Sequence, residues 1–349
     1  MIDLQPGNPV PARPRRPVLV LRLALAVALL AYVVTRVDWS TVVGYRDTVS
    51  WPWLAAFVLL IPLGHVISSA KWRLLLRASG HEVGLWRLTG LYIVGQFYNV
   101  VLPSTIGGDV VRSLGLGRII GDTRTAFAST VAERVTGAAV LVVLGVVATS
   151  LALPDLLTTR DGALDGRIAV LMVLGTIGGT TFAIVAILST RVLALVRRTV
   201  PSMGPLPLWL DRLERFQKAL NEYRRKPLVL GQAIGYSVLF NAVPLAMLYA
   251  GCRVPGASGA TIGMFDALVM MPIILLLGLL PLTPGGYGVM QWAYMVTFAA
   301  WLGVEATEAA TLGLFVSLIH AASNIVVAAS GFAFYTALTA FGNHREPEP

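Results

Sequence analysis

The stretch at 102–112, LPSTIGGDVVR, decides the fold, because it occurs a second time as LPLTPGGYGVM at 280–290. Six of the eleven positions are identical at an offset of 178 residues. Each copy interrupts an apolar stretch with proline and a Gly-Gly pair. Paired breaks at corresponding positions of two halves are typical of transporters, where they mark a substrate site near the middle of the membrane. The alternative is a pair of unrelated Pro/Gly turns.

The composition identifies an integral membrane protein. Hydrophobic residues make up 56% of the chain, charged residues 13%, and the mean hydropathy is +0.74. Soluble domains carry about 25% charged residues. Apolar stretches of membrane-spanning length, about 20 residues, recur along the sequence. We therefore expect a single membrane domain at 17–341, between a disordered basic cytoplasmic tail at 1–16 and a C-terminal tail at 342–349.

The apolar stretches predict an all-α polytopic fold. Shorter apolar segments flank the two breaks, at 85–101 before the first and at 264–281 and 287–303 around the second. Each break therefore predicts a re-entrant hairpin, and the two together predict an inverted repeat. The six full transmembrane helices are expected at 17–36, 52–70, 126–152, 168–189, 228–250 and 309–340.

The loop charges predict the topology. With this layout the inside regions hold 20 of the 27 Lys and Arg residues, and the outside loops hold 5. By the positive-inside rule, both termini are then cytoplasmic and the two hairpins are opposed. The net charge of +9 therefore reflects topology rather than nucleic-acid binding. Segment 205–226 predicts an amphipathic helix in the cytoplasmic interface, serving either as a topological anchor or as a site for anionic headgroups.

The first break carries residues suited to an anionic ligand. Gly107 and Gly108 permit close backbone approach to a ligand and a positive φ. Residues from Asp109 onward begin a returning half-helix, whose N-terminus favours an anionic group; the alternative is that Asp109 caps this helix. Arg112, one turn further on, suits bidentate contact with a phosphate or marks the cytoplasmic edge.

Glu133 and Arg134 form a charged pair inside the long apolar span. A charge at a helix centre costs about 2.5–3.5 kcal/mol on insertion, so it needs a partner or a function. Adjacent helical residues point about 100° apart and pair poorly with each other. We therefore predict that Arg134 pairs with Asp109 and Glu133 with Arg112. The pairs either contact substrate or form an ion-pair network that holds the fold.

These motifs, in this order, resemble the lysylphosphatidylglycerol synthase transmembrane-domain family over about residues 17–340. In multidomain relatives this membrane part is the flippase for an aminoacylated phosphatidylglycerol, made by a separate soluble domain. The resemblance implies a flippase-like role for Asn99, Pro103, Gly107, Gly108, Asp109, Arg112, Glu133, Arg134, Pro284, Gly285 and Gly286. Ser104, Tyr287 and Gln291 add polar groups at the breaks and complete the candidate substrate-binding set. Gln291 departs from the family, because a carboxylate is expected there.

The function expected is translocation or binding of an anionic phospholipid or lipid-linked sugar between the leaflets of a bacterial inner membrane. No catalytic motif, cofactor or metal site is recognised, so an enzyme is not expected. The alternatives are a non-transporting anchor or partner of a lipid-modifying enzyme, and a membrane-embedded lipid transferase. The expected partners are membrane lipids, with a lipid-synthesising enzyme or a second copy of the chain as further candidates, and no nucleic acid.

Overall fold

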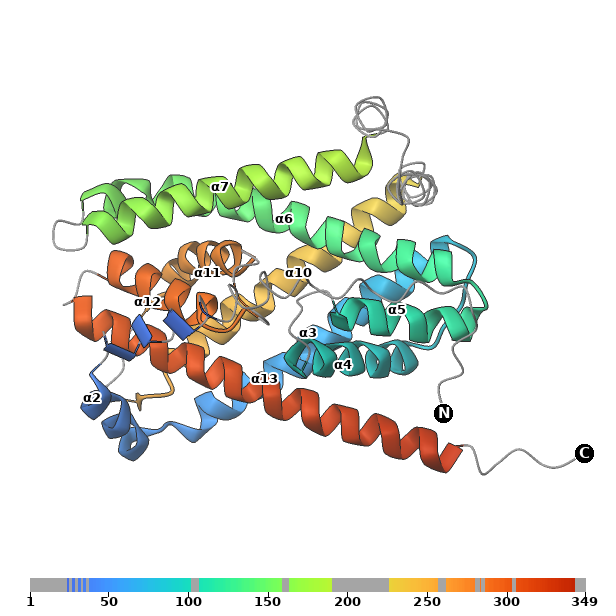
Figure 1. Cartoon of the computed structure of the whole chain (residues 1–349), viewed down its shortest axis with the longest axis horizontal. Coiled ribbons are helices and arrows are strands. Elements are labelled where there is room, and N and C mark those ends of the chain that lie inside the picture. The colour runs from blue at the N-terminus through green and yellow to red at the C-terminus, as the bar shows by residue number, and fades with distance from the viewer. Residues whose placement is uncertain are drawn as a thin grey trace, which may run out of the picture.

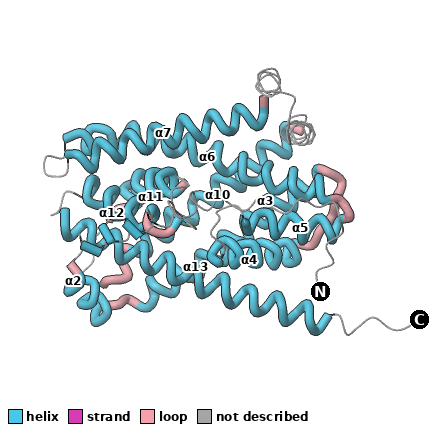
Figure 2. The backbone as a smooth tube through the Cα atoms, viewed as in Figure 1, coloured by secondary structure: helices cyan, strands magenta, loops and turns pink. Residues whose placement is uncertain are grey.

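The computed structural model of the chain is helical throughout the part it describes (Figure 2). It describes residues 38–101, 107–158, 163–189, 226–256, 262–279, 283, 286–302 and 306–342, with seven positions between 24 and 35. The predicted all-α fold class is confirmed for these residues. The elements are α2 (Trp39–Gly44), the short 3-10 helix η1 (Tyr45–Thr48), α3 (Trp51–Ala78), α4 (Leu85–Val101), α5 (Gly107–Ile120), α6 (Thr123–Thr158), α7 (Ala163–Leu188), α10 (Pro227–Gly251), α11 (Met264–Gly278), α12 (Val289–Trp301) and α13 (Ala306–Gly342).

In the part of the chain that the structure describes, four helices are long and apolar enough to cross a membrane. They correspond to four of the six predicted spans and comprise Trp51–Ala78, Thr123–Ala152, Pro227–Gly251 and Thr307–Ala333. The predicted span at 168–189 coincides with α7, of which a shorter section, Val173–Phe182, is strongly apolar. The predicted span at 17–36 and the interfacial helix at 205–226 lie almost wholly outside the described residues.

Helix α3 is longer than the sequence suggested. The predicted span ends at 70, whereas α3 continues to Ala78, where the chain turns through Gly80 at a φ of +84°. Lys71 and Trp72, which read as the first residues of a cytoplasmic loop, are therefore helical and buried. A lysine after an apolar run is typical of a membrane edge, but Lys71 is paired with Glu133 inside the protein.

Eight of the described helices form two sets of four, and the long and short helices follow the same order in both sets. In each set a long helix is followed by two short helices and a second long helix, as α3–α6 and α10–α13. We call α4 and α5 the first helix pair, and α11 and α12 the second helix pair. The two pairs lie at opposite ends of the long helices (Figure 1).

The contacts between the two sets are reciprocal. Helices α3 and α10 pack against each other, α4 packs on α13 of the other set, and α11 packs on α6. In each set the short helices pack together and the second of them also packs on the long helix that follows. The duplication read from the two breaks therefore extends to the packing of both halves.

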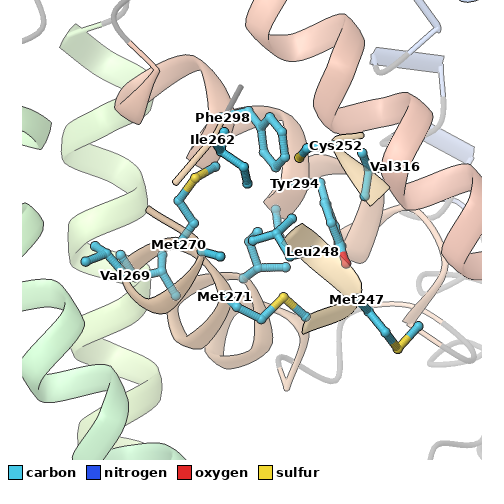
Figure 3. Close-up of a cluster of buried hydrophobic side chains, with 14 of the residues drawn as sticks. Met247, Leu248, Cys252, Ile262, Val269, Met270, Met271, Tyr294, Phe298 and Val316 are labelled. Atoms are coloured by element: carbon cyan, nitrogen blue, oxygen red, sulfur yellow. The ribbon is translucent and has the colours of Figure 1, made fainter. Parts of the chain in front are cut away.

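The largest apolar core lies around the second helix pair. Figure 3 shows methionine, leucine and aromatic side chains of α10, α11, α12 and α13 interdigitated there. Leu248, Met270 and Phe298 are fully buried in it. A smaller apolar cluster, containing Trp72, Leu88 and Leu116, lies beneath the first helix pair.

Candidate functional site

Five charged side chains from three helices meet beside the first helix pair. They are joined by ion pairs, and we call them the charge network: Lys71 of α3, Asp109 and Arg112 of α5, and Glu133 and Arg134 of α6. Helices α3 and α6 are both long enough to span the membrane. Charges at such positions are costly unless they are paired, and they are rarely retained without a role.

Glu133 is the buried centre of the charge network. Its Oε1 lies 3.1 Å from Lys71 Nζ, and its Oε2 accepts a hydrogen bond of 2.8 Å from Arg112 Nη2. The exposed fractions of the three side chains are 5%, 1% and 2%. Lys71 Nζ also donates to the backbone oxygen of Glu133 at 2.9 Å and to Ser237 Oγ of α10 at 3.1 Å. Ion pairs so deeply buried are held by their mutual hydrogen bonds.

Asp109 connects the buried centre to an accessible rim. Its Oδ1 lies 3.0 Å from Arg112 Nε, while Arg134 grips both carboxylate oxygens, with Nε–Oδ2 at 2.9 Å and Nη2–Oδ1 at 2.8 Å. The Asp109 side chain is 17% exposed and that of Arg134 is 49% exposed. Arg134 is therefore the most exposed member of the charge network.

Aromatic rings enclose the Arg112 guanidinium. Its Cζ lies 4.8 Å from the ring centre of Trp72 and 4.5 Å from that of Tyr92 on α4. Arg112 Nη1 is buried and has no hydrogen-bond partner in the described part of the chain. On α3, His65 Nε2 and Ser68 Oγ are buried in the same state, and the His65 ring centre is 5.4 Å from that of Tyr92. Unpaired donors of this kind are costly, so they favour a polar ligand or water.

The charge network carries an excess of positive charge. Three cations, Lys71, Arg112 and Arg134, share two carboxylates, Asp109 and Glu133. At their ordinary ionisation states these five groups have a net charge of +1. In a medium of low dielectric constant such an imbalance attracts an anion strongly. Two guanidiniums provide the planar fork that suits phosphate.

A glycine contact fixes the position of α5. A methyl group placed on Gly108 would overlap the backbone oxygen of Gly95 on α4, and it would lie 2.6 Å from Asn99 Oδ1. Asn99 Oδ1 accepts a hydrogen bond of 2.8 Å from Gly108 N, so it satisfies one of the free amides at the start of α5. The close approach places Asp109 and Arg112 against α6.

Two expectations for the first break need correction. Gly107 and Gly108 are helical rather than at positive φ, and the close approach of Gly108 is to α4. Asp109 does not cap α5, because its carboxylate is engaged by Arg112 and Arg134. Asn99 accepts the hydrogen bond from the start of α5 instead. Glycine is required here for helix packing, which a Gly-Gly sequence does not distinguish from a turn.

The predicted ion pairs are both present. Arg134 pairs with Asp109, and Glu133 pairs with Arg112. The structure thus brings together Asn99, Gly107, Gly108, Asp109, Arg112, Glu133 and Arg134. Pro103, Ser104, Pro284 and Gly285 lie outside the described residues.

The described residues of the second break have local roles. Gly286 and Gly288 have φ of +76° and +88°, which only glycine adopts readily. Gln291 Oε1 accepts a hydrogen bond of 2.7 Å from Gly288 N and so forms part of the N-terminal cap of α12. Tyr287 lies between these two glycines and is half-buried. A carboxylate is expected at position 291, and the side-chain oxygen of Gln291 accepts the capping hydrogen bond that a carboxylate oxygen would accept.

Four residues of the site escaped the sequence analysis as site members. Lys71 and Trp72 were read as the start of a cytoplasmic loop, and Tyr92 and Ser237 were not singled out because an uncharged tyrosine or serine is common in an apolar helix. Only the rule that buried charges are paired points to Lys71, since Glu133 has room for a second cation. His320 and Asn324, one turn apart on α13, belong to the other half. His320 Nδ1 lies 3.1 Å from Tyr294 Oη, and Asn324 Nδ2 donates to the backbone oxygen of His320 at 3.0 Å.

Comparison with known proteins identifies one family. Residues 19–331 match the family described as the lysylphosphatidylglycerol synthase TM region. The match covers α3 to α12, most of α13 and every member of the charge network. No curated protein matches the sequence.

Proposed function

This chain belongs to the lysylphosphatidylglycerol synthase transmembrane-region family, and from that premise we propose that it translocates a lipid between leaflets. The lipid is an anionic phospholipid or a lipid-linked sugar phosphate. The observation that carries the proposal is the charge network, in which three cations share two carboxylates. Two of the helices that hold it, α3 and α6, are long enough to span the membrane. The unbalanced positive charge of this network attracts an anion, which a charge-balanced network would not do.

The different exposure of the three cations favours movement of the headgroup alone rather than passage of the whole lipid through the protein. Arg134 is half exposed, whereas Arg112 and Lys71 are buried behind it. A headgroup phosphate can engage Arg134 first and the deeper cations afterwards. The acyl chains remain in the bilayer, because only the polar group needs polar contacts to cross the apolar layer.

The arrangement of the helices supports an inverted repeat around this path. The two helix pairs lie at opposite ends of the long helices (Figure 1), as opposed re-entrant hairpins require. Four arginines lie at the helix ends that adjoin the turns on either side of the first helix pair: Arg77, Arg87, Arg118 and Arg124. That end is therefore cytoplasmic under the positive-inside rule, which places both termini in the cytoplasm of a bacterial cell.

A liposome assay tests the proposal. The full chain is reconstituted with fluorescent headgroup-labelled phosphatidylglycerol, and dithionite reduction of the outer label reports exchange between leaflets. We expect faster exchange than in empty liposomes, and loss of that acceleration in Arg134→Ala. The matched control is Arg118→Ala, because Arg118 lies on the exposed face of α5 outside the charge network. Equal exchange by wild type and empty liposomes, with folded protein confirmed, would reject transport.

A further inference from the structure

A half-buried arginine without a counter-ion follows the end of α10. Arg253 forms no ion pair with any carboxylate in the described part of the chain. We propose that Arg253, together with Trp53 of α3 and Tyr249 of α10, binds the phosphate of a phospholipid in the leaflet opposite the charge network. This site is separate from the charge network and does not depend on the proposed translocation.

The two ends of α3 each carry a tryptophan that faces a guanidinium. The ring centre of Trp72 lies 4.8 Å from Cζ of Arg112 in the charge network, and that of Trp53 lies 5.6 Å from Cζ of Arg253. The two tryptophans are 19 residues apart, or about 28 Å along a helix axis. The hydrocarbon layer of a bilayer is about 30 Å thick. Arg253 and the charge network therefore lie near opposite faces of the membrane.

The start of α3 has aromatic side chains of the kind found at a membrane surface. Trp51 is 72% exposed and Trp53 is 37% exposed. Tryptophan is enriched where the hydrocarbon layer meets the headgroups, because its ring is apolar and its N–H is polar. These rings place Arg253, which packs on Trp53, at the level of lipid headgroups.

The contacts that hold the Arg253 guanidinium leave part of it free. Its Cζ lies 3.5 Å from the ring centre of Tyr249, so stacking covers one face of the group. Nη1 donates to the backbone oxygen of Tyr249 at 3.0 Å, and Nη2 donates to that of Ile262 at 3.1 Å. A guanidinium has five N–H donors in its plane. The other three have no partner in the described part of the chain and remain for a ligand.

The turn that carries Arg253 is fixed to the segment before α3. Ser50 N donates to the backbone oxygen of Val254 at 2.8 Å, and Val254 is buried. Gly256 has a φ of +63°, and a methyl group placed on it would overlap the backbone oxygen of Thr48. The protein therefore presents Arg253 beside α3 without help from a ligand, and a preorganised site loses little conformational entropy on binding.

The charge and the shape of this site favour a phosphate. A partly buried cation without a counter-ion is costly, and an anion at the membrane surface removes that cost. The planar fork of Arg253 suits two oxygens of one phosphate, while the acyl chains of the same lipid can cover the exposed rings of Trp51 and Trp53. Every phospholipid carries this phosphate. We therefore expect the site to distinguish phospholipids from lipids without phosphate, whatever the rest of the headgroup.

Native mass spectrometry of the full chain in detergent tests the site by counting bound lipids. The protein is titrated with short-chain phosphatidylglycerol, and the variant is Arg253→Gln, whose amide can still donate to a backbone oxygen. The matched control is Arg46→Gln, because Arg46 is an exposed arginine of η1. We expect one bound lipid fewer in Arg253→Gln and no change in Arg46→Gln. An unchanged count in folded Arg253→Gln would overturn the inference.

Arg134→Ala separates this site from the charge network. If both sites bind lipid, each single variant loses one lipid and the double variant Arg134→Ala/Arg253→Gln loses two. If only Arg253→Gln lowers the count, the headgroup site of the charge network is rejected and the site at Arg253 stands. If only Arg134→Ala lowers it, the site at Arg253 is rejected.

The wild type alone tests which chemical group is recognised. Short-chain phosphatidylglycerol and phosphatidylethanolamine should both bind, because both carry the phosphate, and diacylglycerol with the same acyl chains should not displace them. Inorganic phosphate should bind far more weakly. Displacement by diacylglycerol would overturn the recognition of phosphate, and equal affinity for inorganic phosphate would overturn the assignment to a lipid.

Discussion

The two helix pairs have the same backbone plan and different chemistry. Where the first copy of the repeated stretch has Asp109 and Arg112, the second has Tyr287 and Met290. The first pair is joined to its neighbours by buried ion pairs, and the second by an apolar core (Figure 3). A membrane protein can therefore hold a break in either way. Among the described residues, buried ion pairs occur only in the first half, and that half is the better place to look for function.

The largest effect is expected from Glu133→Gln. This change leaves Lys71 and Arg112 buried without their shared counter-ion. The free energy of unfolding should fall by about 3–5 kcal/mol, measured by thermal unfolding in detergent. Glu308→Gln is the control, because Glu308 is exposed at the start of α13. If both variants lost equally little stability, the buried network would not hold the first half together.

The next effect concerns the glycine contact of the first helix pair. Gly108→Ala places a methyl group against the backbone of Gly95, so the helices must separate at a cost of about 1–3 kcal/mol. Exchange of lipid should fall with stability, because Asp109 and Arg112 move with α5.

The glycine control lies on α10. A methyl group on Gly231 meets no atom within 4 Å, so Gly231→Ala should keep both stability and lipid exchange. A stable, active Gly108→Ala protein would show that the distance between α4 and α5 does not position the charge network.

A smaller effect is expected in the second half. Tyr294→Phe removes the hydrogen bond to His320 Nδ1 and leaves the apolar packing in place. The expected loss of stability is about 1 kcal/mol, with lipid exchange retained. Loss of exchange at unchanged stability would move the functional centre toward the second half.

The smallest effect concerns the loop between α5 and α6. Hydrogen bonds from the Thr125 side chain, and then from the Thr125 and Arg124 amides, lower the pKa of Asp122 below its usual value. The stabilisation is therefore present above the unfolded-state pKa, about 3.9, and is lost as the pH falls through the lower folded-state value. Asp122→Ala should cost about 0.5 kcal/mol at neutral pH, the low end for a lost helix cap. The difference from wild type should shrink in acid, as unfolding at several pH values would measure; a difference independent of pH would contradict this role.

Much of the fold follows from the sequence because the physical signals are strong. Apolar runs of membrane-spanning length identify α3, α6, α10 and α13, and the duplicated Pro/Gly phrase identifies the two helix pairs. The pairing of Glu133 with Arg112 follows from the cost of an unpaired charge in a span. Lys71 was read as the cytoplasmic end of a span and not as a site residue, because a lysine after an apolar run has the same appearance whether it faces water or a buried carboxylate. The packing role of Gly108 was not predicted, because no sequence pattern indicates its contact with Gly95 on the preceding helix.

The comparison of the two halves is tested most directly by measuring lipid exchange for Arg134→Ala and Tyr294→Phe together. Both are purified, confirmed as folded and reconstituted at equal density with labelled phosphatidylglycerol. We expect loss of accelerated exchange in Arg134→Ala and retention in Tyr294→Phe. The reason is that the charge network, with its excess cation, belongs to the first half of the molecule, whereas Tyr294 belongs to the second. Normal exchange by Arg134→Ala, with or without a defect in Tyr294→Phe, would contradict the assignment of the headgroup site to the charge network.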